Sequence, residues 1–223
     1  MASEGSGASA REVVLGRIRA ALGGSSSAVA VEAGWDGIRR GYQRSARRQR
    51  GEVIELFEDR LRDYDAQVVK VSRGEVASAA AKMLAGRGVK RLVIPAGLRG
   101  DLMVEGYKFL VDEGLAAAEL NAVDGVVTES TLAIAETGTI VLQTKSGQGR
   151  RAISLVPDYH LCVVDTRDVV ETVPEAMDKL AATAELATTF ISGPSATADI
   201  EMTRIKGVHG PRFLDVIVAG GKL

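Results

Sequence analysis

The sequence is poor in the residues that usually hold metals. It contains one cysteine, Cys162, and two histidines, His160 and His209, among 223 residues. One thiol cannot close an internal disulfide bond, and an iron–sulfur cluster needs about four thiolates. Two histidines leave little for a zinc site. We therefore expect no metal and no cofactor in this chain, and we expect Cys162, which lies inside the apolar stretch 160–164, to be buried and unreactive.

Aromatic residues and an excess of one charge are also scarce. Aromatic side chains make up 4% of the chain, and the net charge is −1. A base-stacking surface and a basic footprint are therefore not expected, which argues against a nucleic-acid partner. No run of 18 apolar residues appears, and the N-terminus lacks the apolar core of a signal peptide. We expect a cytoplasmic protein without a membrane span.

Three common motifs of catalysis and nucleotide binding are missing. The sequence contains no GxGxxG fingerprint of a dinucleotide-binding fold and no GxxxxGK[ST] loop for a nucleotide phosphate. It also has no GxSxG nucleophile elbow of a serine hydrolase. Any ligand of this chain must be held by another arrangement of residues.

The hydrophobic content of 46% is enough for a sizeable core, and short apolar runs alternate with helical patterns. This alternation predicts an α/β fold in which helices flank a mainly parallel sheet. The expected strands are 66–71, 91–95, 125–127, 139–143, 152–156, 160–164, 188–192 and 213–218. The expected helices are 11–22, 52–64, 76–85, 102–112, 130–135 and 173–185. Only three residues separate 152–156 from 160–164, too few for a crossover helix, so the sheet is expected to be mixed or bent there.

The N-terminal part is predicted to be separate from the main domain. We expect a disordered tail over 1–10, a helical extension with a basic arm over 11–65, and an α/β domain over 66–223. Six arginines lie within 39–50. This segment is either a mobile solvated arm or an arm that closes over a ligand or docks on a partner.

A first candidate site lies in the stretch TESTLAIAETGT, residues 128–139. Ser130 or Thr131 can cap the expected short helix and leave free N–H groups for an anion. Glu136 could act as a general base, as a nucleophile or as an acceptor for ligand hydroxyls, or it could be a solvated turn residue. Gly138 permits a positive φ or the close approach of a ligand.

A second candidate site lies in ISGPSATADIEMTRIKGVHGP, residues 191–211. Ser195 is a candidate helix N-cap after a strand, an arrangement that can hold a phosphate or carboxylate. Asp199 and Glu201 share one side of an extended segment and could bind a metal only with further oxygen ligands. His209 lies among glycines and proline on a loop, so it is either a catalyst or a hydrogen-bonded structural residue.

Both stretches follow apolar strands, and ligands of open α/β sheets bind at the carboxyl ends of strands. We predict that Glu136 and His209 are catalytic. The predicted ligand-binding residues are Thr137, Gly138, Thr139, Ser192, Gly193, Ser195, Thr197, Asp199 and Glu201. The loop 143–151 adds Lys145, Arg150 and Arg151, which hold an anionic group if the loop faces the same edge and otherwise form a solvated tip.

The runs AIAETGTIVL at 133–142, ISGPSATADIEMTRIKGVHGP at 191–211 and VIVAG at 216–220 resemble the LUD domain family. The similarity is to its lactate-utilisation protein C branch and covers roughly residues 11–220. The basic segment 39–50 does not match the family pattern.

The resemblance implies a fold similar to the NagB/RpiA/CoA-transferase group. It implies that this chain is a non-redox component of a system that oxidises L-lactate to pyruvate together with two iron–sulfur partner subunits. In CoA transferases of that fold group a glutamate is the nucleophile, an idea that transfers here only to Glu136. The alternative is a stand-alone enzyme or sensor, similar to a sugar-phosphate isomerase or CoA transferase, which binds a phosphorylated or carboxylated ligand at the strand-end loops.

Overall fold

The computed structural model describes residues 9–23, 27–197, 205–207 and 209–221, which form two compact units, 1–42 and 43–223. In the first unit, α1 (Ala10–Ala21) begins at Ser9, whose hydroxyl accepts a hydrogen bond from the N–H of Glu12. Helix α2 (Ala28–Asp36) begins in the same way at Ser27. Such side-chain caps satisfy N–H groups that the first turn of a helix leaves free.

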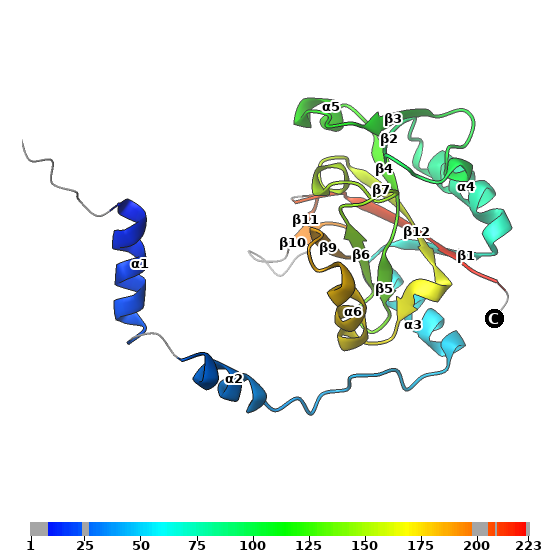
Figure 1. Cartoon of the computed structure of the whole chain (residues 1–223). Helices are drawn as coiled ribbons and strands as arrows, with labels where there is room; N and C mark the ends of the chain where they lie inside the picture. Colours follow the sequence, from blue (N-terminus) through cyan, green and yellow to red (C-terminus); the bar gives the residue numbers. More distant parts are fainter. Residues whose placement is uncertain (1–8, 24–26, 198–204, 208, 222–223) are drawn as a thin grey trace, which may run out of the picture. The chain divides into compact units, whose positions relative to one another are not determined.

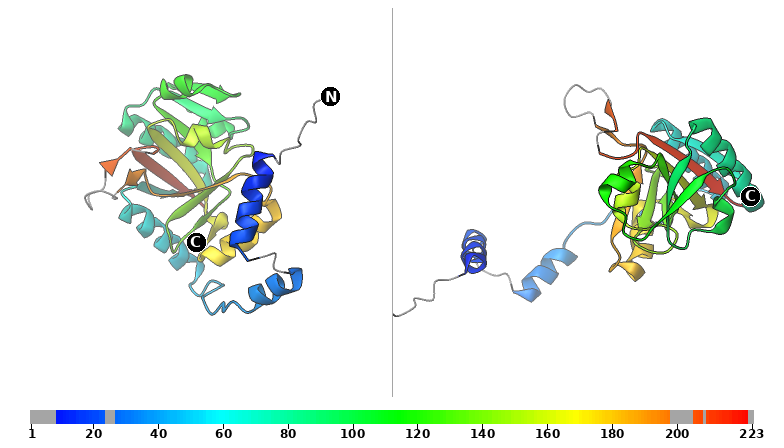
Figure 2. Two further views of the ribbon diagram at one scale, coloured as in Figure 1. Left: turned by 90° about the vertical axis from the view of Figure 1, so that its left-hand side faces the viewer. Right: turned by 90° about the horizontal axis from the view of Figure 1, so that it is seen from above.

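The second unit contains a six-stranded parallel sheet in the order β1-β12-β7-β4-β2-β3 (Figure 1). Its strands are β1 (Gln67–Val71), β2 (Arg91–Pro95), β3 (Lys108–Asp112), β4 (Gly125–Glu129), β7 (Tyr159–Asp165) and β12 (Phe213–Ala219). Figure 2 shows β12, in red, running through this unit. The central strands are nearly continuous runs of buried apolar residues, as expected of a parallel sheet covered on both faces.

A second sheet of four strands has the order β8-β5-β6-β9. Its strands are β5 (Leu132–Ile134), β6 (Thr139–Gln143), β8 (Val169–Val170) and β9 (Thr188–Ser192). Strands β10 (Ala196–Thr197) and β11 (Ile205–Lys206) pair separately as an antiparallel ladder. The mainly parallel α/β fold with flanking helices is thereby confirmed.

Helices bury the two faces of the large sheet in separate apolar clusters. Helix α4 (Val76–Arg87) packs with β2, β7 and β12 on one face and ends at Gly88, which has a φ of 68°. Helix α3 (Arg50–Asp63) and the four-stranded sheet cover the other face. Helix α6 (Val173–Leu180) covers the outer side of the four-stranded sheet, and α5 (Ala117–Asn121) precedes β4. Among the described residues, no helix is both long and apolar enough to cross a membrane.

Three local expectations are wrong. Residues 102–112 were expected as a helix, but they form a short 3₁₀ turn at Gly100–Leu102 and strand β3, because Gly106 has a φ of 87° and the following segment pairs with β2. Residues 130–135 form β5 instead of a helix, since a short apolar run fits either state and pairing with β6 decides. Residues 152–156 are not a strand, because Arg151–Ser154 is a 3₁₀ turn just before Pro157.

A buried carboxylate binds residues 43–48 of the basic arm. The side chain of Glu171 is fully buried and accepts hydrogen bonds from the N–H groups of Arg47, at 2.8 Å, and Arg48, at 2.9 Å. Glu171 also accepts hydrogen bonds from Arg48 Nη1, at 2.7 Å, and from the Gln43 side-chain amide, at 3.2 Å. Residues 43–48 are therefore tied to the α/β unit, while α3 supplies part of its core.

Candidate functional site

The two stretches singled out in the sequence lie on neighbouring strands. Strand β6 begins at Thr139 and β9 ends at Ser192, and these two residues are paired across the antiparallel ladder. Thr139 Oγ1 lies 2.7 Å from Ser192 Oγ and 2.7 Å from Thr137 Oγ1. A continuous chain of hydroxyl groups therefore connects the turn before β6 with the end of β9.

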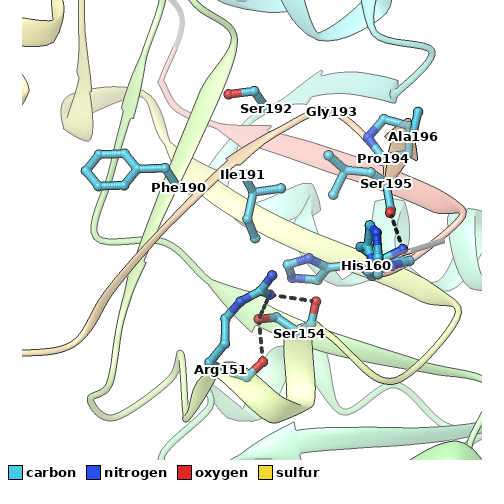
Figure 3. A pocket seen from close by; sticks show the side chains of 14 residues that line it. Arg151, Ser154, His160, Phe190, Ile191, Ser192, Gly193, Pro194, Ser195 and Ala196 are labelled. Carbon is cyan, nitrogen blue, oxygen red and sulfur yellow. Dashed lines mark hydrogen bonds between the residues drawn. The ribbon is translucent and has the colours of Figure 1, made fainter. Parts of the chain in front are cut away.

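A pocket of about 280 Å³ opens beyond Ser192 (Figure 3). Both histidines of the chain line it: His160 from β7 and His209 from the loop after β11. The remaining lining residues come from the 3₁₀ turn, from β9 to β10, from the loop before β12 and from the start of β12: Arg151, Ser154, Phe190, Ile191, Ser192, Gly193, Pro194, Ser195, Ala196, Gly210, Pro211 and Leu214. This volume suits a small ligand, because pockets for drug-sized molecules begin at roughly 300 Å³.

The position of the pocket differs from the expected one. His160 and Leu214 are each the second residue of their strand and are paired in register. The pocket therefore lies near the amino ends of β7 and β12. The chain itself fills part of the carboxyl edge of the sheet, where Glu129 N–H donates to Gly147 O and Gly147 N–H donates to Ala96 O. The expectation that the site lies at the carboxyl ends of the parallel strands is wrong for this pocket.

His160 is a buried, neutral imidazole at the base of the pocket. Its exposed fraction is 1%, and its Nε2 atom lies 2.8 Å from Thr128 Oγ1. Burial, together with the nearby charge of Arg151, lowers its pKa from 6.5 to about 4. A neutral ring at pH 7 keeps a lone pair on one nitrogen, so it can accept a proton there.

Arg151 brings a positive charge to the same wall. Its Nη1 group donates to the hydroxyl of Ser154 at 3.2 Å, and Figure 3 shows its guanidinium beside the His160 ring. Across the part of the chain that the structure describes, no carboxylate forms an ion pair with Arg151, whereas Arg150 next to it pairs with Asp112 at 2.8 Å. An unneutralised guanidinium in a pocket favours an anionic ligand, above all a carboxylate or phosphate.

The opposite wall is built on Ser195. Its hydroxyl accepts a hydrogen bond from the N–H of His209 at 3.1 Å, and its own N–H donates to Pro211 O at 2.8 Å. The expected helix after Ser195 is absent, because the next two residues form β10. Ser195 therefore fixes the loop that carries His209 instead of capping a helix.

The predicted site residues separate into three groups. Ser192, Gly193, Ser195 and His209 line the pocket. Asp199 and Glu201 lie outside the described residues, and Thr197 is placed only as the second residue of β10. The residues of the turn before β6, Glu136 to Thr139, do not line the pocket.

The turn before β6 is held against α3 instead. The side chain of Glu136 is exposed, and its N–H donates to Glu171 O at 3.1 Å. A Cβ atom placed on Gly138 would lie 2.8 Å from Arg60 Cβ, so glycine is required for this contact as well as for the φ of 57°. The catalytic role predicted for Glu136 stays a prediction.

The start of the stretch 128–139 also differs from the structure expected from the sequence. Thr131 Oγ1 donates to Gln148 Oε1 at 2.7 Å, and Ser130 Oγ donates to Val163 O at 3.3 Å. Neither residue caps a helix, since β5 takes the place of the expected helix. An anion site at that helix N-terminus is therefore ruled out.

Sequence reasoning did not assign His160 and Ser154 to the site. His160 was interpreted only as the first residue of an apolar strand, although a histidine there is an unusual core residue. Arg151 was considered only together with Lys145 and Arg150, and the structure separates the three. Lys145 and Arg150 line another pocket of about 450 Å³ near the ends of β2 and β3.

Cys162 is fully buried, as expected, and burial raises the pKa of its thiol to about 12. Its sulfur lies 3.6 Å from Thr128 Oγ1, the same hydroxyl that contacts His160. No group of three or more His, Cys, Asp or Glu side chains is arranged to hold a metal ion within the described ranges.

The fold and this pocket define an α/β protein with a small site suited to anions beside the main sheet. The LUD domain family model matches residues 23–219, and the chain belongs to the LUD domain family. A lactate utilization protein C of Deinococcus radiodurans is 45% identical over 174 residues, which are 77% of this chain and 81% of that protein. A lactate utilization protein C of Macrococcus caseolyticus is 30% identical over 77% of this chain and 73% of its own length.

A crystal structure of a DUF162 family protein from Deinococcus radiodurans has the same fold. Its TM-score is 0.69 and its sequence identity is 41%, over 78% of this chain and all of that chain.

Proposed function

We propose that this chain has a role in lactate utilisation as the non-redox component of a system that oxidises L-lactate to pyruvate with two iron–sulfur partner subunits. One line of support is that relatives of this chain are named lactate utilization protein C. The support from the structure is the pocket in which Arg151 and both histidines of the chain meet; among the described residues no carboxylate pairs with Arg151.

In this proposal the pocket binds a small 2-hydroxy or 2-oxo carboxylate. Arg151 holds the carboxylate, since a guanidinium matches its two oxygens. Ser195 offers its hydroxyl group at the other wall. The volume of about 280 Å³ suits a ligand with few heavy atoms.

Oxidation of lactate to pyruvate removes two electrons and two protons. In this proposal both electrons and both protons leave to the iron–sulfur partner subunits. The pKa of His160 is about 4, so the ring is unprotonated at pH 7 and is too weak a base to take the hydroxyl proton; its role is to accept a hydrogen bond from the lactate hydroxyl. The work of this chain is then to bind and orient the substrate.

The test is L-lactate-dependent dye reduction by the two partner subunits with and without this chain. The proposal requires the rate to depend on this chain. It also requires Arg151→Gln to raise the lactate KM at least tenfold, whereas Lys145→Gln, a matched loss of charge outside the pocket, leaves it unchanged. A rate indifferent to this chain would overturn the proposal.

The alternative is a stand-alone enzyme or sensor, and one observation favours it. The pocket already combines Arg151 with two histidines, a set that can bind a small anion. Calorimetric titration of the isolated chain with lactate, pyruvate, phosphate and a sugar phosphate decides this. Tight binding of a phosphorylated ligand, with no effect on lactate oxidation, would favour the alternative.

A further inference from the structure

The pocket of His160 has an apolar wall to which the proposed function gives no role. Ile191 in β9 and Leu214 in β12 contribute aliphatic side chains to the lining. Leu214 is 2% exposed and belongs to the apolar cluster that α3 covers. Ile191 packs against the same cluster but is only partly buried, so the remainder of its side chain faces the pocket.

The course of β9 directs Ile191 toward the polar residues at the base of the pocket. Successive residues of a strand point to opposite faces of a sheet, so Phe190 and Ser192 point to the face opposite that of Ile191. Figure 3 shows the Ile191 side chain extending toward the Arg151 guanidinium and the His160 ring, whereas the Phe190 ring extends away from them. Ile191 is therefore the side chain of β9 that a ligand held by Arg151 and His160 would meet.

This position decides what the third group of a 2-hydroxy acid can be. Its C2 carbon carries a carboxylate, a hydroxyl group and one further substituent besides hydrogen. With the carboxylate on Arg151 and the hydroxyl group at His160, the substituent lies within reach of Ile191. An aliphatic side chain neither donates nor accepts a hydrogen bond, so a polar substituent would give up its water there without gaining a partner. An apolar substituent would be stabilised by the same contact.

We propose that Ile191 makes this pocket select a methyl group on C2. The preferred ligand is then a 2-hydroxy acid of the lactate type. Glycolate, which has a hydrogen atom in that position, and glycerate, which has a hydroxymethyl group, are disfavoured. This selectivity rests on the proposed function, because the carboxylate is taken to lie on Arg151.

Calorimetric titration of the full chain with L-lactate, glycolate and L-glycerate tests the selectivity. The wild-type chain should bind L-lactate about tenfold more tightly than either other acid, since one carbon atom more or less in an apolar site changes affinity by about that factor or more. Ile191→Ala should lower this preference to about twofold, because the methyl group loses its contact. The affinity for glycolate should hardly change, since glycolate has no methyl group.

A second variant changes the polarity of the wall and keeps its shape. Ile191→Thr retains the branched β-carbon that suits a strand and brings a hydroxyl group to the wall. The hydroxymethyl group of glycerate then has a hydrogen-bond partner. Glycerate binding should therefore improve relative to lactate binding in this variant.

Leu56 of α3 provides the matched control. It is partly buried against the same apolar cluster as Ile191, and it does not line the pocket. Leu56→Ala removes the same number of carbon atoms as Ile191→Ala, so it reproduces the loss of packing at a distance from the ligand. All three affinities should stay unchanged in this variant. Thermal melts of the variants verify that they fold.

Arg151→Gln separates a failure of this selectivity from a failure of the proposed function. If no acid binds the wild-type chain, or if Arg151→Gln leaves binding unchanged, the carboxylate does not lie on Arg151 and both are overturned. If Arg151→Gln weakens the binding of all three acids but Ile191→Ala keeps the preference of the wild-type chain, only the role of Ile191 is overturned. A preference that Leu56→Ala removes as fully as Ile191→Ala would overturn that role as well.

Discussion

The imidazole of His160 and the hydroxyl of Thr128 face each other at 2.8 Å on neighbouring strands of the parallel sheet. Both side chains are buried, and the same hydroxyl lies 3.6 Å from Cys162 Sγ. A hydroxyl has one proton to donate, so Thr128 either donates to the imidazole or receives its N–H and donates to the sulfur. The direction of this hydrogen bond and the tautomer of the His160 ring are therefore coupled.

Removing this hydroxyl should destabilise the protein. Thr128→Val keeps the side-chain shape but leaves the buried Nε2 without a partner, which costs about 1–3 kcal/mol. Urea denaturation measures the loss. Thr128→Ser retains the hydroxyl and should lose much less. A valine variant as stable as the serine variant would contradict the importance of this contact.

The depressed pKa of His160 predicts how stability changes with pH. The folded protein binds the proton with a pKa of about 4, against 6.5 for the unperturbed ring. The unfolded chain therefore takes up the proton first on acidification. The stabilisation is complete above pH 6.5 and is lost as the pH falls toward 4, by an amount on the order of 3 kcal/mol.

Urea denaturation of the wild-type protein and of His160→Gln between pH 4 and pH 7.5 checks this pH dependence. The variant lacks the titrating ring, so its stability should fall less steeply over that range. Parallel curves for the two proteins would show that His160 does not titrate as described.

Loss of the Glu171 carboxylate should release the basic arm. Glu171→Gln leaves N–H groups of Arg47 and Arg48 and the Arg48 guanidinium with a weaker acceptor. Because the Arg48 side chain is 45% exposed, solvent screens this ion pair, and the loss is about 1–2 kcal/mol. Amide hydrogen exchange at Arg47 and Arg48 should become faster.

Glu175→Gln is the matched control for the arm. Glu175 accepts from Ala46 N–H at 3.1 Å, so its loss should affect that amide and not the two arginine amides. The hydrogen bonds from the arm outweigh burial and lower the pKa of Glu171. Its contribution to stability is therefore present above the pKa of an unfolded glutamate and is lost on acidification.

Gly193 should not tolerate a side chain. It has a φ of 80°, and an added Cβ atom would lie 2.4 Å from Tyr64 Cβ. Gly193→Ala therefore combines backbone strain with a clash and should cost about 2 kcal/mol more than strain alone.

Gly106→Ala separates these two effects. Gly106 has a φ of 87° but no heavy atom within 4 Å of an added Cβ, so this variant suffers only the strain. Thermal denaturation compares the two variants. Equal losses of stability would show that the contact with Tyr64 is not limiting.

Much of the fold follows from local sequence. The strands around Val93, Ile140 and Ile217 are runs of β-branched and aliphatic residues, and such runs form buried parallel or central strands wherever they lie in the chain. Gly88 ends α4 because it has no Cβ to oppose a positive φ. The two polar stretches were expected to act together, and Thr139 and Ser192 do pair.

The sequence by itself determined the α/β class, the order of most strands and the family, because these depend on residue types and short motifs. Tertiary structure alone decided that residues 132–134 form β5 and that residues 108–112 join the large sheet, since pairing with β6 and β8 in the first case and with β2 in the second selects the strand. It also decided which residues line the pocket. His160, Arg151 and His209 are separated in sequence and meet only when the strand, the 3₁₀ turn and the loop pack together. Charge and burial then make His160 a neutral ring, and no local pattern encodes that combination.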